Sequence, residues 1–218
     1  MIEERGGGDV AVGLTDCIVL AAGASTRMGG RKLHLPFGRS TVLGATVDAA
    51  LAAGLRVIVV GRPDDSLLEA FAIPGRVLLA INPEPDRGML SSLRAGLVLS
   101  AQARNPAHGF FFIPADMPLV KTSSYEALLA RRHVGPVIAT FRGRRGHPVF
   151  MPPALSDAVL ALPNDGNLRA LIDASKPLFV ETDDEGTVTD IDYPYEYESA
   201  TALHAEGISS SCIPRVGA

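Results

Sequence analysis

The sequence is poor in cysteine, in long apolar segments and in excess positive charge. Only two cysteines occur among 218 residues, and Cys17 lies in an apolar run typical of a buried strand. We therefore expect no disulfide framework and a reducing compartment. No apolar stretch approaches the ~20 residues that a membrane span requires. The net charge of −4 and the pI near 5.7 lack the basic field of a nucleic-acid-binding protein, so we expect neither a membrane nor a nucleic-acid partner.

The start of the chain lacks the basic and hydrophobic regions of a secretory signal, because acids precede any apolar run between Met1 and Asp16. This pattern predicts a cytoplasmic protein. A composition of 47% hydrophobic and 20% charged residues fits one domain, which we expect over residues 16–207. Residues 1–15, which contain three consecutive glycines, are expected to form a flexible leader, and residues 208–218 a disordered tail. There is no internal repeat.

Short apolar runs alternate with helical stripes along most of the chain. Leu43, Val47 and Ala50 recur at helical spacing before Gly54, and a second stripe lies within Gly88–Ala103. The runs are typical of strands covered on both faces. This alternation predicts a mostly parallel sheet in a three-layer α/β/α sandwich, whose ligands bind beyond the carboxyl ends of the strands. The expected strands are Cys17–Leu20, Val57–Val60, Val77–Ile81, Phe110–Ile113 and Val137–Thr140.

A loop of small residues followed by cations comes directly after the first predicted strand. Small residues let backbone N–H groups approach phosphate oxygens, and Arg27, Arg31 and Lys32 add positive charge at the same place. An ordinary strand-to-helix turn with solvated cations is the alternative. Nine positions favour the phosphate loop, since they resemble the L-A-A-G-x-S-x-R-M-G-x-x-K signature of nucleotidyltransferases. They are Leu20, Ala21, Ala22, Gly23, Ser25, Arg27, Met28, Gly29 and Lys32.

Two acidic turns are candidate magnesium sites. Asp116 follows a hydrophobic strand and lies at the same edge as the phosphate loop, where a carboxylate and phosphate oxygens could share Mg²⁺. Its alternative role is to cap the turn before Pro118, but the neighbouring phosphate loop favours the metal. Asp192 is the second candidate ligand, with Asp190 in reserve; both precede a helix that we expect to begin near Pro194. Capping of that helix is the alternative for these two acids.

The segment Asn82–Gly96 enters a helix through Gly88 and two hydroxyl residues, Ser91 and Ser92. A helix start exposes N–H donors, which together with these side chains could read a nucleobase edge or a ribose. We therefore place Asn82, Gly88, Ser91 and Ser92 in the nucleotide site. Simple capping by Ser91 or Asp86 is the alternative.

A basic loop is expected between strands at Arg142–Phe150, and it could receive an anionic second substrate. Arg145, Gly146 and His147 are its candidate acceptor-binding residues; the alternative is a solvated hairpin loop in which His147 caps the next strand. Asp165 and Arg169 are further candidates, in a turn where Asp165 either caps a helix or orients Arg169. No Ser-His-Asp or zinc-ligand spacing is present.

Taken in order, these motifs resemble the molybdenum cofactor nucleotidyltransferases, in particular their cytidylyltransferase branch. The resemblance runs from about Cys17 to Glu206 and includes Asp116-Met-Pro118, Arg145-Gly-His-Pro148 and Asp190-Ile-Asp-Tyr-Pro194. It departs from the family pattern where Met117 replaces glutamine, where Asn164 and Asn167 replace glycines, and at Tyr195 and Glu196. These departures leave the reaction class intact and put the acceptor in doubt.

The resemblance implies a Rossmann-like nucleotidyltransferase of the nucleotide-diphospho-sugar transferase type. It would join an NMP to a phosphorylated pterin and release pyrophosphate, with Arg27, Lys32 and Asp116 as catalytic residues and Mg²⁺ held by Asp116 and Asp192. Ala22 favours CTP over GTP, because guanylyltransferases more often carry glycine there. A molybdoenzyme or its chaperone is an expected transient partner.

Several alternatives to this function remain. The acceptor could be a sugar phosphate, methylerythritol phosphate or another cofactor, and the donor could be GTP. The chain could also be a noncatalytic nucleotide-binding accessory protein, whereas a dinucleotide-binding dehydrogenase is disfavoured because the loop lacks G-x-G-x-x-G.

Overall fold

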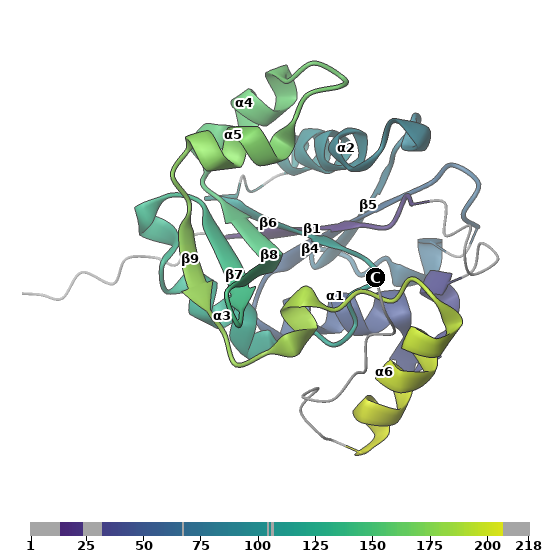
Figure 1. Cartoon of the computed structure of the whole chain (residues 1–218). Coiled ribbons are helices and arrows are strands. Elements are labelled where there is room, and N and C mark those ends of the chain that lie inside the picture. The colour runs from purple at the N-terminus through teal and green to yellow at the C-terminus, as the bar shows by residue number, and fades with distance from the viewer. Residues whose placement is uncertain (1–13, 24–31, 67, 104, 106, 207–218) are drawn as a thin grey trace, which may run out of the picture.

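The computed structural model describes residues 14–23, 32–66, 68–103, 105 and 107–206. Within them, seven strands form one sheet in the order β5-β4-β1-β6-β8-β7-β9 (Figure 1). The neighbours β5, β4, β1 and β6 are mutually parallel, β7 and β9 are parallel, and β8 runs antiparallel to both β6 and β7. The strands are β1 (Asp16–Leu20), β4 (Arg56–Gly61), β5 (Val77–Ile81), β6 (Phe110–Pro114), β7 (Val137–Phe141), β8 (Arg144–Met151) and β9 (Leu178–Glu181).

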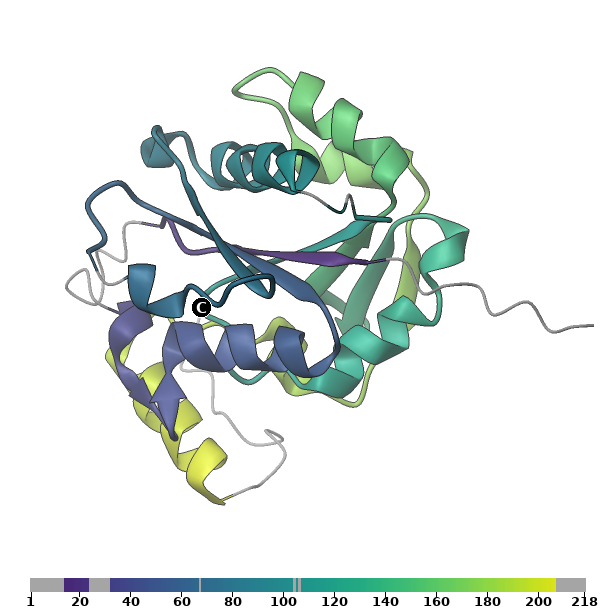
Figure 2. The ribbon, with the colours of Figure 1, turned by 180° about the vertical axis from the view of Figure 1, so that it is seen from behind.

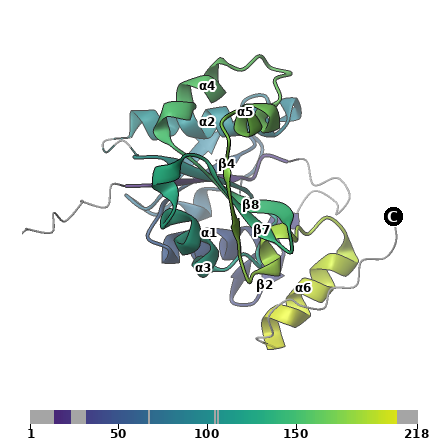
Figure 3. The ribbon, with the colours of Figure 1, turned by 60° about the vertical axis from the view of Figure 1, so that its left-hand side comes forward.

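Helices cover both faces of the sheet. α1 (Val42–Ala52) and α3 (Thr122–Leu129) lie on one face, while α2 (Met89–Gln102), α4 (Ser156–Ala161) and α5 (Leu168–Ala174) lie on the other (Figures 1 and 2). α6 (Pro194–Glu206) lies beside the small hairpin β2 (Pro36–Phe37) and β3 (Ser40–Thr41), at the outer side of the α1 layer (Figure 3). Six short 3-10 helices complete the described chain: η2 (Lys32–His34), η3 (Leu68–Phe71), η4 (Pro85–Arg87), η5 (Arg132–Val134), η6 (Pro153–Leu155) and η7 (Glu185–Val188).

The hydrophobic core is split into two layers by the sheet. Alternate residues of β1 face opposite sides, so that Cys17 and Val19 pack toward α1 whereas Ile18 packs toward α2. The three-layer α/β/α sandwich expected from the sequence is confirmed. Among the described helices, none combines the length and the apolar character needed to cross a lipid bilayer.

The local predictions for the five strands and for the first two helices are also confirmed. Gly54 adopts φ +78° directly after α1, which explains why a glycine follows that helix. The helix expected near Pro194 begins at that residue. The proposed single domain over residues 16–207 stays a prediction, and the predicted leader and tail lie almost wholly outside the described residues.

The expected loop over Arg142–Phe150 is wrong, because a tight turn at Arg142 and Gly143 leads directly into β8. Proline is uncommon inside a strand, since it has no N–H to donate to the ladder. β8 accommodates it because the pairing with β7 shifts register between Val149 and Arg145, so that Pro148 lies where the ladder is interrupted.

Two of the three helix-capping alternatives are wrong as well. Gly88 is the N-cap of α2, with no side-chain cap from Ser91 or Asp86. Asn167 caps α5 by accepting a hydrogen bond from Ala170 N, so Asp165 is not the cap. α2 therefore begins at Gly88, the glycine through which the sequence predicted the helix to be entered, whereas the capping of α5 by Asn167 was not predicted.

Candidate active site

The candidate site lies at the carboxyl edge of β1 and β6, as the position of the ligand crevice in parallel sheets predicts. A pocket of about 360 Å³ opens there. Five segments contribute its walls: the end of β1, the 3-10 helix η2, the segment from η4 to the start of α2, the end of β6 with the turn after it, and the turn before α6. The lining residues used below are Leu20, Ala22, Gly23, Lys32, Gly88, Met89, Ser92, Asp116 and Asp192.

An ion cluster occupies one side of this pocket. Lys32 Nζ donates hydrogen bonds to Asp116 Oδ2 at 2.7 Å and to Asp192 Oδ1 at 3.1 Å. The Lys32 side chain is only 6% exposed, while those of Asp116 and Asp192 are 20% and 35% exposed. The cluster thus combines a buried ammonium with two carboxylates that remain accessible from the pocket.

The backbone brings the two acidic turns together. Ile191 N donates a 2.9 Å hydrogen bond to the carbonyl oxygen of Asp116, which aligns the chain before α6 with the end of β6. Glu196 then accepts hydrogen bonds from the N–H groups of Asp192 and Tyr193, at 2.7 and 2.9 Å. Glu196 therefore fixes the turn that carries Asp192, a role that the sequence did not reveal.

Burial and neighbouring charges shift the pKa values of Lys32 and Asp190. Burial acts to lower the pKa of Lys32, but Asp116 and Asp192 act more strongly together and the net pKa is raised, so this lysine stays cationic. The pKa of Asp190 is raised, mainly by burial and also by the nearby carboxylates of Asp116, Asp192 and Glu196. Asp190 consequently lies close to the cluster but favours its neutral form more than an ordinary aspartate does.

The donor set is compatible with a divalent cation. Asp116 Oδ1 is buried and makes no hydrogen bond, although its partner oxygen binds Lys32. An unpaired carboxylate oxygen of this kind is costly unless a ligand supplies positive charge. No cluster of three or more metal-ligating side chains is found in the described residues, and magnesium typically uses only one or two protein carboxylates.

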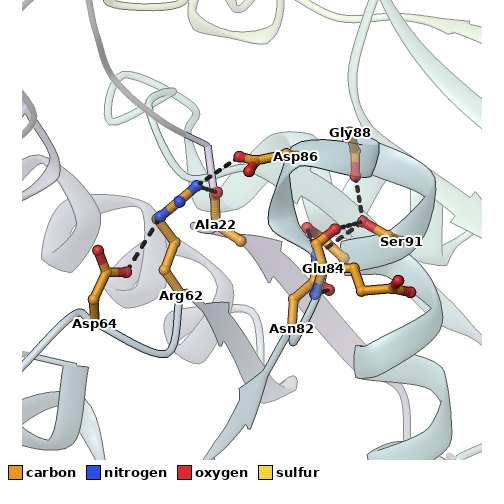
Figure 4. Close-up of polar contacts among 9 residues, drawn as sticks. Ala22, Arg62, Asp64, Asn82, Glu84, Asp86, Gly88 and Ser91 are labelled. Carbon is orange, nitrogen blue, oxygen red and sulfur yellow. Dashed lines mark hydrogen bonds and ion pairs between the residues drawn. The ribbon is translucent and has the colours of Figure 1, made fainter.

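The wall at the start of α2 is built by a network of side chains (Figure 4). Asn82 Nδ2 donates to Ser91 Oγ at 2.9 Å and to Ser92 Oγ at 3.0 Å, while Asn82 Oδ1 accepts from Glu84 N. Ser91 Oγ donates to the carbonyl oxygens of Glu84 and Gly88. Of the four predicted nucleotide-binding residues in this segment, Gly88 and Ser92 line the pocket. Asn82 and Ser91 do not line it but stabilise the wall through their hydrogen bonds.

The other predicted nucleotide-binding residues are partly described. Leu20, Ala22 and Gly23 line the pocket, and Ala21 is buried with its N–H donating to the Val60 carbonyl oxygen. Ser25 and Arg27 lie outside the described residues. The structure therefore brings the start of the predicted phosphate loop into the same pocket as Lys32 and Asp116, and the proposed roles of the loop residues remain predictions.

Two of the predicted acceptor-binding residues lie in a second groove beside the first. Asp165 and Arg169 line a shallow depression of about 490 Å³ between the start of α2 and the start of α5. Met89 lines both this groove and the 360 Å³ pocket. The two spaces are thus neighbours, which is the arrangement that a two-substrate reaction requires.

The remaining acceptor candidates lie on β8 and have structural partners on other elements. Arg145 forms a 2.6 Å ion pair with Asp173 and lies 4.6 Å over the ring of Phe179. A Cβ on Gly146 would lie 2.0 Å from the Thr187 carbonyl oxygen, so this position requires glycine for close packing. His147 Nδ1 lies 3.4 Å from the Phe112 carbonyl oxygen, and burial lowers the pKa of His147 to about 4. His147 is therefore neutral at pH 7 and does not offer positive charge to an anion.

Similarity to known proteins shows the family to which the chain belongs. The family model described as "MobA-like NTP transferase domain" matches residues 17–178. The chain belongs to this family. Within it, molybdenum cofactor cytidylyltransferase of Escherichia coli (strain K12) is 30% identical over 193 residues, which cover 88% of this chain and 97% of the relative. The purine catabolism protein PucB of Bacillus subtilis (strain 168) is 28% identical over 83% of this chain and 93% of its own.

Solved structures agree on the fold. A nucleotidyl transferase from Methanothermobacter has a TM-score of 0.73 at 23% identity, covering 89% of this chain and 99% of that chain. A Mycobacterium tuberculosis protein solved in complex with manganese has a TM-score of 0.62 at 23% identity, covering 87% and 98%. This MobA-like chain is a nucleotidyltransferase with the Rossmann-like fold predicted from its sequence.

One arginine beside this pocket was not predicted from the sequence. Arg62 directly follows β4, and its guanidinium donates a 3.3 Å hydrogen bond to the carbonyl oxygen of Ala22 in the pocket wall. A cation placed just after an apolar strand, at the carboxyl edge of the sheet, is the signal that could have identified it.

Proposed function

We propose that the chain transfers CMP from CTP to the phosphate of molybdopterin, or of its molybdenum-loaded form, and releases pyrophosphate. The observation that carries the proposal is the cluster of Lys32, Asp116 and Asp192 at a pocket whose other wall is the start of α2. The identity of 30% with a molybdenum cofactor cytidylyltransferase supports the donor and the acceptor.

The chemistry needs no nucleophilic side chain. An oxygen of the ionised acceptor phosphate attacks the α-phosphorus in line, and the bond from that phosphorus to the bridging oxygen breaks. Pyrophosphate leaves with the bonding electrons, so negative charge grows on the bridging oxygen. Catalysis of such a step depends on positioning and on electrostatic stabilisation. The Lys32 ammonium is cationic and lines the pocket, where it would pair with the triphosphate. Arg27 is proposed to act beside it.

Asp116 and Asp192 would hold Mg²⁺. The unpaired oxygen of Asp116 and the partly exposed carboxylate of Asp192 are the two groups that fit a hard cation. When bound, the ion would neutralise phosphate charge and orient the triphosphate. Lys32 would then exchange one or both carboxylates for phosphate oxygens, because its ammonium cannot pair fully with all of them at once.

The choice of CTP rests on the pocket wall at Ala22 and on the relative named above. Ala22 is 1% exposed, so its methyl group fills the wall where glycine would leave a gap beside the base. One methyl group discriminates by only about 1–3 kcal/mol, so other wall residues must contribute. Gly88 and Ser92, which line the opposite wall, are the proposed contributors.

The groove lined by Asp165 and Arg169 is the proposed place of the acceptor. Its position beside the pocket, with Met89 shared, would bring an acceptor phosphate toward the α-phosphorus. A molybdoenzyme or its chaperone would receive the product.

Pyrophosphate release tests the proposal. Wild-type protein is assayed with each NTP, with and without molybdopterin, in Mg²⁺ and in EDTA. We expect release to require CTP, molybdopterin and the metal, to fall steeply in Asp116→Asn, and to persist in Asp157→Asn, which alters an exposed acid on α4. Turnover with a sugar phosphate or with methylerythritol phosphate in place of molybdopterin would overturn the acceptor assignment. Equal or better use of GTP would overturn the donor assignment.

A further inference from the structure

Arg62 lies at a point where the two walls of the nucleotide pocket can be connected. The sheet order β5-β4-β1 places β4 between β1, which leads into the phosphate loop, and β5, which leads into η4 and the start of α2. The pocket wall formed by η4 and the start of α2 is called the η4 wall below, and the wall at the end of β1 the Ala22 wall. Backbone bonds already join both to β4: Ala21 N donates to Val60 O, and Asn82 N donates to Gly61 O. Arg62 directly follows Gly61, the last residue of β4, and so lies just beyond these two backbone hydrogen bonds.

The guanidinium of Arg62 extends this connection with its side chain (Figure 4). Its Nη1 atom donates to the Ala22 carbonyl oxygen at 3.3 Å and lies 3.5 Å from Asp86 Oδ1 in η4. Its Nε atom pairs with Asp64 Oδ1 at 3.3 Å, which fixes the guanidinium from its own loop. One side chain therefore contacts both walls, although neither contact is part of the sheet.

The contacts of Arg62 with Ala22, Asp64 and Asp86 are long and partly exposed to solvent. We therefore expect Arg62 to position the pocket walls rather than to stabilise the fold. The Arg62 side chain is 28% exposed, and those of Asp64 and Asp86 are 79% and 88% exposed. Exposed ion pairs contribute little to stability. The internal network of Asn82 and Ser91 shapes the η4 wall by itself, so loss of Arg62 would leave that wall intact and free to shift relative to Ala22.

We propose that Arg62 is a positioning residue that sets the separation of the Ala22 wall from the η4 wall, and thereby the size of the base that the pocket accepts. The inference rests on the proposed binding of a nucleoside triphosphate in this pocket. Ala22 and Gly88 both line the pocket, and Arg62 is linked to the segment of each. A pocket held at fixed width favours the smaller pyrimidine, whereas a loosened one admits the purine.

Calorimetric titration with CTP and with GTP, in Mg²⁺ and without acceptor, tests this role. Arg62→Met removes the connection, and Arg76→Met is the matched control, because Arg76 also donates to a backbone carbonyl, that of Leu51, from an exposed position away from the pocket. We expect Arg62→Met to weaken CTP binding about five- to tenfold, the loss of one modest hydrogen-bonded contact, and GTP binding by less. The CTP-to-GTP affinity ratio should fall at least about threefold by the same reasoning, while Arg76→Met keeps the wild-type ratio.

Two further variants keep the test independent of folding. Arg62→Lys should restore part of the ratio, and Asp86→Asn, which spares the contact with Ala22, should lower it by a smaller factor than Arg62→Met. An unchanged ratio in Arg62→Met, or a proportional loss of both affinities together with the melting temperature, would overturn the inference. Failure of the proposed acceptor would appear in pyrophosphate release and would leave these acceptor-free titrations unaffected.

Discussion

Replacing Lys32 with methionine removes the ammonium of the ion cluster and keeps most of the volume of the buried stem. Lys32 Nζ lies 2.7 Å from Asp116 Oδ2 and 3.1 Å from Asp192 Oδ1, so it occupies the position between the carboxylates where a cation is expected. In the variant these two carboxylates face each other without compensation, and a formal charge of −1 for the three groups becomes −2. We therefore expect two opposite effects: weaker turnover and tighter binding of a free metal ion.

The magnitudes follow from the geometry. A unit charge about 4 Å from a cation is worth about 4 kcal/mol at an effective dielectric constant of 20. The exposure of Asp116 (20%) and Asp192 (35%) reduces this value through solvent screening. We expect Mn²⁺ to bind the nucleotide-free variant at least about tenfold more tightly, which corresponds to roughly 1.4 kcal/mol. Loss of a charge-assisted phosphate contact, worth roughly 1.5–3 kcal/mol, should lower turnover at least about tenfold.

Free Mn²⁺ measured by electron paramagnetic resonance during titration gives the metal affinity without nucleotide or turnover. Thermal unfolding with and without Mg²⁺ adds a second measurement, since the metal should restore stability that the variant loses. Lys121→Met is the control, because it removes an exposed lysine before α3. Equal or weaker Mn²⁺ binding by Lys32→Met would show that the lysine does not occupy the cation position. Unchanged pyrophosphate release would remove it from the mechanism.

Four further substitutions test the metal ligands Asp116 and Asp192 and the packing of β8 at Gly146 and His147. Asp116→Asn should weaken the Mg²⁺ dependence of pyrophosphate release more than it lowers the melting temperature, with Asp192→Asn acting equally or less; a wild-type metal titration in Asp116→Asn would contradict this. Gly146→Ala should destabilise the fold by about 2 kcal/mol or more in urea unfolding, because the new Cβ would lie 2.0 Å from the Thr187 carbonyl oxygen; a stability equal to wild type would show that the strand shifts freely. His147, whose pKa falls from 6.5 to about 4 on burial, takes up its proton more readily in the unfolded chain, so stability should decline by up to about 3 kcal/mol as the pH falls from 6.5 to 4. His147→Gln should make that decline shallower, and parallel pH profiles for the two proteins would argue against the shift.

Local sequence patterns were sufficient to predict the architecture. Runs such as Val57–Val60 and Phe110–Ile113 are apolar on both faces, which is the requirement for a strand between two helical layers, and Gly54 marked the end of α1. β8 was missed because Gly146 and Pro148 are typical of a loop. Their tolerance in a strand depends on the shifted pairing with β7 and on the backbone of Thr187, neither of which is encoded locally.

The chemistry of the site was likewise readable as residue types, since a lysine after a small-residue loop and acids after strands point to phosphate and metal. Which of these residues contact one another was decided by the tertiary structure. Lys32 contacts Asp116 and Asp192 across 84 and 160 residues of sequence, through the parallel pairing of β1 with β6 and the backbone bond that joins Ile191 to Asp116. Arg62 acquired its position from the placement of β4 between β1 and β5. Sequence determines which groups are available and which segments are buried, whereas distances between remote side chains depend on strand order and register, and only the folded sheet specifies these.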